Sequence, residues 1–214
     1  RDTSVTGVQT CALPISDVDL TDQHTVAVVG ALSPTTGTSP IAQSIVWQSG
    51  GVNPNVINLS SAQLAALHSV LDSALSVSIV KDSTGSGTGQ ISWKFSAADS
   101  NFDFLAQGET LVVTYNVQVT DSNNGNSNVV PVTITITGTN DAPVIVAQTG
   151  DATSASITEQ VGQIGLTTAD SASGTLTLKD VDLSDTHQVM VVRSSAVWHQ
   201  VGTGGTTIAL GGAP

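Results

Sequence analysis

The chain has 214 residues and carries 17 acidic against 5 basic side chains, which gives a formal net charge of −12. This charge argues against nucleic acid or an anionic membrane surface as a partner, because both require basic patches. Only 3% of the residues are aromatic, and the abundance of Thr, Ser, Val and Gly favours strands and turns over helices. No apolar run reaches the roughly 20 residues that a membrane-spanning helix needs.

The first fifteen residues, RDTSVTGVQTCALPI, resemble the conceptual translation of a sequencing-library adapter, and no turn or continuing pattern joins them to Ser16. We therefore predict that residues 1–15 are an artefact that lies outside the fold, the alternative being a genuine first strand. This segment contains Cys11, the one cysteine of the chain. Without it no disulfide can form, so a secreted β-protein of this kind would need another staple, such as bound metal.

A ten-residue acidic motif occurs twice in the chain, at an offset of 163 residues. Residues 17–26 read DVDLTDQHTV and residues 180–189 read DVDLSDTHQV. A match of this length predicts two copies of one module. We expect the first copy to lack its start and the second to lack its end.

Residue periodicity predicts the elements of the first copy. Ser60 and Gln63 have the spacing of a helix capping box, and Leu64, Leu67 and Leu71 share one face of the helix expected at residues 60–71. Alternation of apolar and polar residues predicts strands elsewhere, with a hairpin turn at residues 121–126. The expected strands are residues 25–29, 45–47, 75–80, 90–95, 110–120 and 128–137.

The segment GTNDAPV, residues 138–144, separates the last of these strands from a second apolar run. A polar turn between two strand-like runs indicates a linker between β-domains, and Pro143 stiffens it by fixing its own φ. We expect one domain at residues 16–139, a linker at 140–143 and a truncated second domain at 144–214. Strands are predicted in the second domain at residues 143–147, 155–159, 174–179 and 188–192, with weak order in the tail at 194–214.

These segments together resemble the VCBS repeats and related cadherin-like domains of large bacterial RTX-type adhesins. The resemblance rests on the acidic motif at residues 180–185, the run at 93–110, the VTD that ends a strand at 119–121, and GTNDAP at 138–143. It implies an all-β, immunoglobulin/cadherin-like Greek-key sandwich with one short helix, followed by a partial second copy. It also implies a tandem-repeat extender that supports cell adhesion, exported by a type I system to the cell surface.

The same resemblance implies calcium as a cofactor at the joints between repeats. It places the ligands of the joint between the two copies at Glu109, Asn140, Asp141, Asp180 and Asp182, and those of a half-site at the other end of the first domain at Asp17, Asp19 and Asp121. Asp22 and Asp185 are further candidates, and Glu159 would face a later linker. Gly138 stands where cadherins carry another Asp, which leaves the number of ions open. The alternative is that these residues only make turns and caps.

Catalysis is not expected. His24 and His187 have no second His or Cys at zinc-ligand spacing, and no Gly-x-Ser-x-Gly lies between a strand and a helix. The expected partners are calcium, neighbouring repeats of the same chain, and surface glycans or like modules on other cells. Two other roles stay open: a carbohydrate-binding module, in which Trp47 and Trp93 could stack on sugars, and an accessory domain of a secreted hydrolase.

Overall fold

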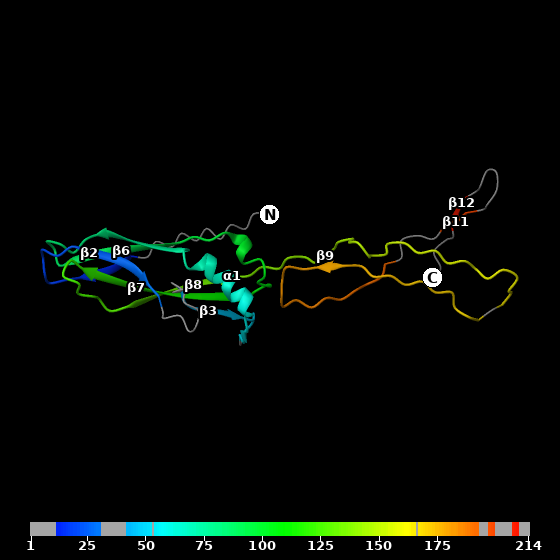
Figure 1. Cartoon of the computed structure of the whole chain (residues 1–214), viewed down its shortest axis with the longest axis horizontal. Helices are drawn as coiled ribbons and strands as arrows, with labels where there is room; N and C mark the ends of the chain where they lie inside the picture. Colours follow the sequence, from blue (N-terminus) through cyan, green and yellow to red (C-terminus); the bar gives the residue numbers. More distant parts are fainter. Residues whose placement is uncertain are drawn as a thin grey trace.

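Strand β7, Thr110–Asp121, is the central strand of the five-stranded sheet, the largest sheet described in the computed structural model (Figure 1). The structure describes residues 12–30, 42–52, 54–165, 167–192, 197–199 and 207–209. Alternate side chains of a strand face opposite sides of the sheet. The inward residues Leu111, Val113 and Tyr115 are accordingly 0% exposed, so β7 supplies the middle of the hydrophobic core.

The larger sheet is antiparallel and has five strands. One edge of β7 pairs with β3, Ala42–Gln48, near its start and with β2, His24–Val29, near its end. The other edge pairs with β8, Val130–Thr137. β4, Val56–Ile57, pairs with the far side of β3. This arrangement brings the end of β7 beside the start of β2, where the first acidic motif lies.

The smaller sheet has three strands in the order β1–β6–β5. Its strands are β1, Ala12–Ser16, β6, Thr88–Phe95, and β5, Leu75–Lys81. Ile91 and Trp93 of β6 join Ile136 of β8 in one buried cluster. The core of the molecule therefore lies between the two sheets.

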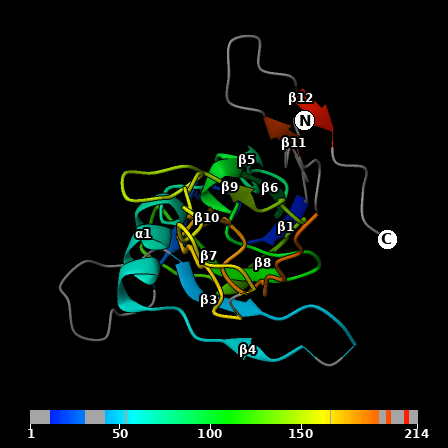
Figure 2. The same ribbon diagram turned by 90° about the vertical axis from the view of Figure 1, so that its right-hand side faces the viewer.

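Helix α1, Ser61–Leu71, lies at one side of the two sheets when the molecule is viewed along its long axis (Figure 2). The predicted capping box is confirmed, since Gln63 N–H donates to Ser60 Oγ at 3.3 Å and Ser60 N–H donates to Gln63 Oε1 at 2.8 Å. Leu67 and Leu71 are buried as expected, but Leu64 is 36% exposed. The buried Tyr115 hydroxyl donates to Leu71 O at 2.8 Å and ties the helix end to β7.

The expectation that residues 1–15 lie outside the fold does not hold for residues 12–15. These residues form β1, which pairs with β6, and Ile15 is buried in the core. At the offset of the repeat, ALPIS of β1 aligns with TLTLK at residues 175–179, so Leu13 and Ile15 occupy the apolar positions of Leu176 and Leu178. The alternation of apolar and polar residues is by itself enough for this segment to pair at the edge of a sheet. Residues 1–11 lie outside the described part.

Residues 144–192 form two extended segments that lie side by side (Figure 1). They are joined by β9, Val144–Ile145, paired with β10, Leu178–Lys179, and by Asp151, whose carboxylate accepts from Thr177 N–H at 3.0 Å. The strands predicted at 155–159 and 188–192 are not formed. By the repeat offset, residues 188–192 match most of β2, and the described part of the chain holds no second copy of β7 for them to pair with.

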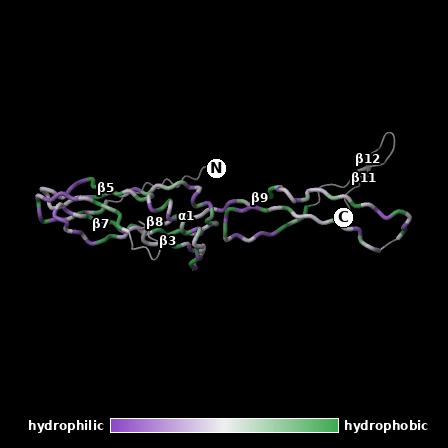
Figure 3. Tube along the Cα trace, viewed as in Figure 1, coloured by the Kyte–Doolittle hydropathy of each residue, from purple (hydrophilic) through white to green (hydrophobic). Residues whose placement is uncertain are grey.

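Hydrophobic residues occur along these extended segments as well as in the sandwich (Figure 3). Their side chains are exposed, however, and the described core ends at Ile136. Val189, Met190 and Val191 are each more than 80% exposed, at 89%, 82% and 91%. In the tail, β11, Val197–His199, pairs with β12, Thr207–Ala209; the rest of residues 193–214 lies outside the described part. Residues 144–192 thus form an extended arm rather than a packed unit.

The described chain is mostly antiparallel β-sheet with one short α-helix, as the sequence predicted, and its two packed sheets are consistent with a β-sandwich. A single 3₁₀ turn, η1, Asp99–Asn101, precedes the loop that leads into β7. Over the described residues, no helix combines the length and apolar character that crossing a membrane requires.

Candidate cation sites at the two ends of the sandwich

The two copies of the acidic motif adopt the same local structure. In the first copy, residues 17–24, Asp19 N–H donates to Asp17 Oδ1 at 2.9 Å and Asp22 N–H donates to Asp19 O at 3.1 Å. His24 Nε2 lies 2.8 Å from Asp17 Oδ2. The corresponding three distances in the second copy, residues 180–187, are 3.0, 3.2 and 2.7 Å. The motif therefore encodes a defined acidic loop.

At the end of the sandwich away from the linker, Asp17, Asp22 and Asp121 each offer a carboxylate oxygen within 4.8 Å of the others. Asp121 ends β7, and its Oδ1 accepts from Asn123 N–H at 2.8 Å and from Gly125 N–H at 2.7 Å. A Cβ on Gly125 would lie 2.4 Å from Asp121 Oδ2, so a larger residue there would displace this carboxylate.

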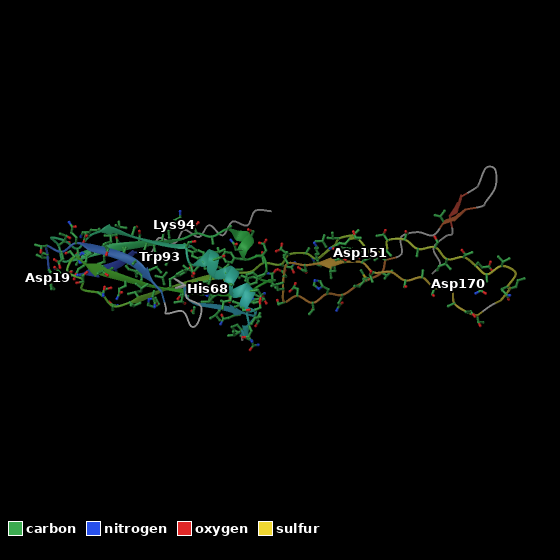
Figure 4. The ribbon with its side chains drawn as sticks, in the orientation of Figure 1. Asp19, His68, Trp93, Lys94, Asp151 and Asp170 are labelled. Atoms are coloured by element: carbon green, nitrogen blue, oxygen red, sulfur yellow. The ribbon has the colours of Figure 1, made fainter. Side chains whose placement is uncertain are left out.

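The third carboxylate of this end cluster is Asp22, whereas the sequence had assigned Asp19. Asp22 is buried, 6% exposed, and its Oδ2 accepts from Asn123 Nδ2 at 2.8 Å. Asp19 is exposed and lies at the tip of the molecule (Figure 4). The sequence had named Asp22 as a further calcium candidate without placing it in this cluster; it is the Asp of the motif closest to β2.

His24 lies between two carboxylates beside this cluster. Its side chain is only 3% exposed; Nε2 lies 2.8 Å from Asp17 Oδ2, and Nδ1 lies 2.6 Å from Asp82 Oδ1. The hydrogen bond to Asp17 raises the His24 pKa, against the opposing effect of burial, and Asp82 adds to the rise. The Asp17 pKa is lowered by the Asp19 N–H and by His24. A protonated His24 can donate to both carboxylates at once.

Ser83, His24 and two aspartates thus come together, but not in the geometry of a nucleophilic triad. The buried Ser83 Oγ lies 3.3 Å from Nδ1 and 3.4 Å from Nε2 of His24, facing both nitrogens about equally. Each ring nitrogen already has a carboxylate partner. A general base needs a nitrogen free to take the hydroxyl proton, and this arrangement offers none.

A hollow of about 230 Å³ lies against the end cluster and is lined by Asp17, His24, Asp121 and neighbouring residues of β1 and the β7–β8 turn. The atoms around it that could bind a metal are carboxylate oxygens, which are the ligands of hard cations. Converging carboxylates repel one another unless a positive charge lies among them. His24 supplies one such charge when protonated, and a divalent cation could supply another.

At the linker end, the second acidic loop lies against the sandwich. Asp182 is buried, 3% exposed, and its Oδ2 accepts from Asp141 N–H at 2.8 Å. Its Oδ1 is buried and has no hydrogen-bond partner in the described part of the chain. Burial raises the Asp182 pKa, the Asp141 N–H opposes the rise, and the charges of Asp185, Asp141 and Asp180 add to it.

Glu109 is also at the joint, but it is held as a hydrogen-bond acceptor inside the sandwich. It is 5% exposed, and its Oε2 accepts from Trp47 Nε1 at 2.9 Å and from Ala106 N–H at 3.0 Å. Its Oε1 accepts from the Ser184 hydroxyl at 2.6 Å. Both oxygens therefore have donors, and Glu109 links the second acidic loop to the buried Trp47.

The structure brings Asp141, Asp180 and Asp182 together and leaves Asn140 exposed, with no hydrogen bond among the described residues. Among the described residues, the end cluster has three carboxylates within 4.8 Å of one another, whereas the carboxylates of the joint form no such group. Asp180 is instead engaged by His187 at 2.7 Å, and this bond lowers its pKa.

Gly138 departs from the cadherin pattern for a steric reason. A Cβ there would lie 2.3 Å from Leu105 O and 2.5 Å from Ala106 O. No side chain fits at this position, so an aspartate could not occupy it.

Sequence reasoning missed Asp103 at this end. Burial raises its pKa, and the charge of Asp141 raises it further, which places Asp103 in the electrostatic surroundings of the joint. Its position just before Phe104, at the end of a turn, carries no distinguishing pattern. Glu159 is exposed on the extended arm, so its implied role at a later linker stays a prediction.

No family model matches the chain, and neither the curated proteins nor the solved structures include a match to it.

Proposed function

We propose that the chain is part of a tandem β-sandwich extender of a large secreted bacterial adhesin, in which calcium stiffens the joints between repeats. The proposal includes an immunoglobulin/cadherin-like Greek-key topology, a second copy of the module from residue 144, and export to the cell surface. It includes no catalytic role. The repeated acidic loop, folded alike in both copies, supports a tandem arrangement.

The observation that carries the proposal is the buried carboxylate of Asp182. Leaving a buried acceptor without a donor costs about 1–3 kcal/mol, and more when it is charged. Asp182 Oδ1 is in this position, with the charges of Asp141, Asp180 and Asp185 around it. A cation bound to Oδ1 would remove both the cost of the missing donor and the repulsion from the surrounding negative charges. Protonation of Asp182 is the other way to remove them.

Calcium fits these residues better than the other common metals. The available donors are oxygens of carboxylates and backbone carbonyls, with Asn140 nearby in sequence, and calcium takes six to eight such ligands in flexible geometry. The described sites contain no cysteine and only carboxylate-paired histidines, which argues against zinc or copper. Extracellular modules bind calcium with Kd values of roughly 10⁻⁴–10⁻³ M.

The carbohydrate-binding alternative loses its main support. Trp47 and Trp93 are 4% and 8% exposed and belong to the core. No aromatic residue is among the exposed large hydrophobic side chains of the described chain. Stacking on a sugar ring requires an exposed aromatic face, so neither tryptophan is positioned for it.

Calcium titration of the full chain tests the proposal. At about 10 mM calcium and a Kd of roughly 10⁻⁴–10⁻³ M, binding adds about 1.4–2.7 kcal/mol to the free energy of unfolding. The melting temperature should then rise by roughly 3–10 °C relative to EDTA. Magnesium at the same concentration should raise it less, because magnesium needs stricter octahedral geometry.

Three variants locate the effect. Asp182→Asn should remove the part of the calcium response that comes from the joint, and Asp22→Asn the part from the end cluster. Asp170→Asn, an exposed aspartate far along the extended arm, is the matched control (Figure 4) and should keep the full response. Identical melting curves in calcium and EDTA would contradict the proposal. A full response in Asp182→Asn would contradict calcium at the joint.

A further inference from the structure

The second acidic loop is attached to the sandwich and to the linker by three contacts that need no metal. Asp182 Oδ2 accepts from Asp141 N–H at 2.8 Å, Leu183 N–H donates to Phe104 O at 3.2 Å, and Ser184 Oγ donates to Glu109 Oε1 at 2.6 Å. Leu183, which is 55% exposed, also lines an apolar hollow of about 200 Å³ at α1. The outer face of the loop is therefore an interface.

This face lies in a socket made of Trp47, Phe104 and Glu109 of the sandwich and Asp141 of the linker. Trp47 Nε1 fixes Glu109 at 2.9 Å, and the Phe104 ring meets the Trp47 ring edge-on, with centroids 5.2 Å apart. Trp47 is 4% and Glu109 5% exposed, so little side-chain freedom is left to lose on docking. The Glu109 Oε1 atom is thus aimed at the position of an incoming hydroxyl.

The first acidic loop has the same internal hydrogen bonds, but its outer face is bare. Asp19, Leu20 and Thr21 correspond to Asp182, Leu183 and Ser184 at the repeat offset. Asp19 is exposed, whereas its counterpart Asp182 is 3% exposed. Leu20 at 52% and Leu183 at 55% are exposed to a similar degree, so the two faces differ in the burial of the aspartate and in hydrogen bonding. In the described part of the chain, the Asp19 carboxylate, the Leu20 N–H and the Thr21 hydroxyl have no hydrogen-bond partner. Thr21 offers the same hydroxyl donor as Ser184.

We propose that the outer face of the first acidic loop, made by Asp19, Leu20 and Thr21, is a docking surface for the Trp47–Glu109 socket of another module of this sequence joined ahead of it. The socket and the loop lie at opposite ends of one sandwich (Figure 1). An interface between different ends of identical units can repeat head to tail along an array. The hydrogen bond from the loop hydroxyl to Glu109 determines which loop fits the socket. This inference rests on the proposed tandem arrangement but not on calcium.

The first experiment places the first loop's sequence at the existing joint. In the full chain, Ser184→Thr with Thr186→Gln makes residues 180–187 identical to residues 17–24. The Asp141 and Leu183 amides and the Trp47 indole N–H are followed by hydrogen exchange in EDTA. We expect exchange within about twofold of the original chain. Ser184→Val, which removes the hydroxyl, should speed exchange by about tenfold or more.

The second experiment tests the docking itself. A chain of residues 1–179 followed by residues 17–214 places the first loop behind a complete socket. Thr21→Val in that loop should speed exchange of the preceding Asp141 amide by about tenfold. Thr25→Val is the matched control, because its hydroxyl bonds Thr120 O within its own module, and it should leave this amide unchanged.

The inference is overturned if the two-residue swap speeds amide exchange at the joint as much as Ser184→Val does. It is also overturned if the preceding Asp141 amide exchanges at the same rate in Thr21→Val and in Thr25→Val. Because exchange is measured in EDTA, these outcomes leave the calcium response untouched. Conversely, a chain that docks as expected but melts identically with and without calcium would contradict the proposed function alone.

Discussion

At the scale of single residues, Glu109 and Asp182 have different roles at the joint. Glu109 has donors on both oxygens, two from its own sandwich and one from Ser184. Asp182 is as deeply buried but has one free oxygen. A satisfied carboxylate orients a contact, whereas an unsatisfied one calls for a cation or a proton. The two residues therefore differ in role, although the resemblance noted in the sequence implied calcium at both.

The residue set of the end cluster leads to a pH prediction. The His24 pKa is raised from 6.5, so the contribution of His24 to folding stability is fully present below pH 6.5 and is lost as pH rises through the higher folded pKa. The Asp17 and Asp82 pKa values are lowered from 3.8, so their contributions are present above pH 3.8 and lost as pH falls. Urea unfolding in EDTA should show greatest stability between these limits.

His24→Gln tests this assignment, because glutamine keeps a hydrogen-bond donor without the titrating charge. We expect the variant to be less stable than the original chain near pH 5. Its free energy of unfolding should also fall much less between pH 6 and pH 9 than that of the original chain. His68→Gln is the control, since His68 is partly exposed and lies 3.3 Å from Asp72 on α1. An unchanged pH profile in His24→Gln would show that the paired imidazolium does not hold this end together.

At the scale of elements, sequence patterns located most of the first sandwich. Six predicted strands and the helix correspond to β2, β3, β5, β6, β7, β8 and α1. Alternation and capping are local signals, so they survive without any knowledge of packing. They failed at β1, where a Pro-containing segment judged foreign nonetheless pairs with β6. They also failed at residues 188–192, where strand formation depends on a distant partner.

The position of β1 gives a testable consequence for stability. Ile15 is 8% exposed and packs in the core, while Ser16 is exposed. Ile15→Ala should lower the free energy of unfolding by about 2–3 kcal/mol, because it leaves a cavity in the core. Ser16→Ala should change it by less than about 0.5 kcal/mol. Urea denaturation of both variants checks this; equal stabilities would mean that β1 adds nothing to the sandwich.

At the scale of the whole molecule, the candidate sites depend on contacts that no local pattern contains. Asn123, 101 residues away in sequence, selects Asp22 rather than Asp19 for the end cluster. Ser184 reaches Glu109 across 75 residues. The repeat showed that the two acidic loops are equivalent. Their facing partners, however, are set by how the β7–β8 turn and the socket lie at opposite ends of the sandwich, which only the three-dimensional structure gives.

The whole molecule thus has a packed body of two sheets with a loop and a socket at its two ends, joined to an extended arm (Figure 1). Such a unit suits an extender, in which stiffness at each joint sets the reach of the array. Stiffness at the joint comes from two separable sources in this account. One is the hydrogen-bonded socket, and the other is a cation at the buried Asp182 oxygen.

The most direct test of the cation is anomalous X-ray diffraction from crystals of the full chain grown with calcium. The account predicts an anomalous peak about 2.3–2.6 Å from Asp182 Oδ1, the usual calcium–oxygen distance, with further oxygens of the joint around it. A joint that keeps the same contacts at saturating calcium, with no peak and only a water beside Asp182 Oδ1, would contradict it.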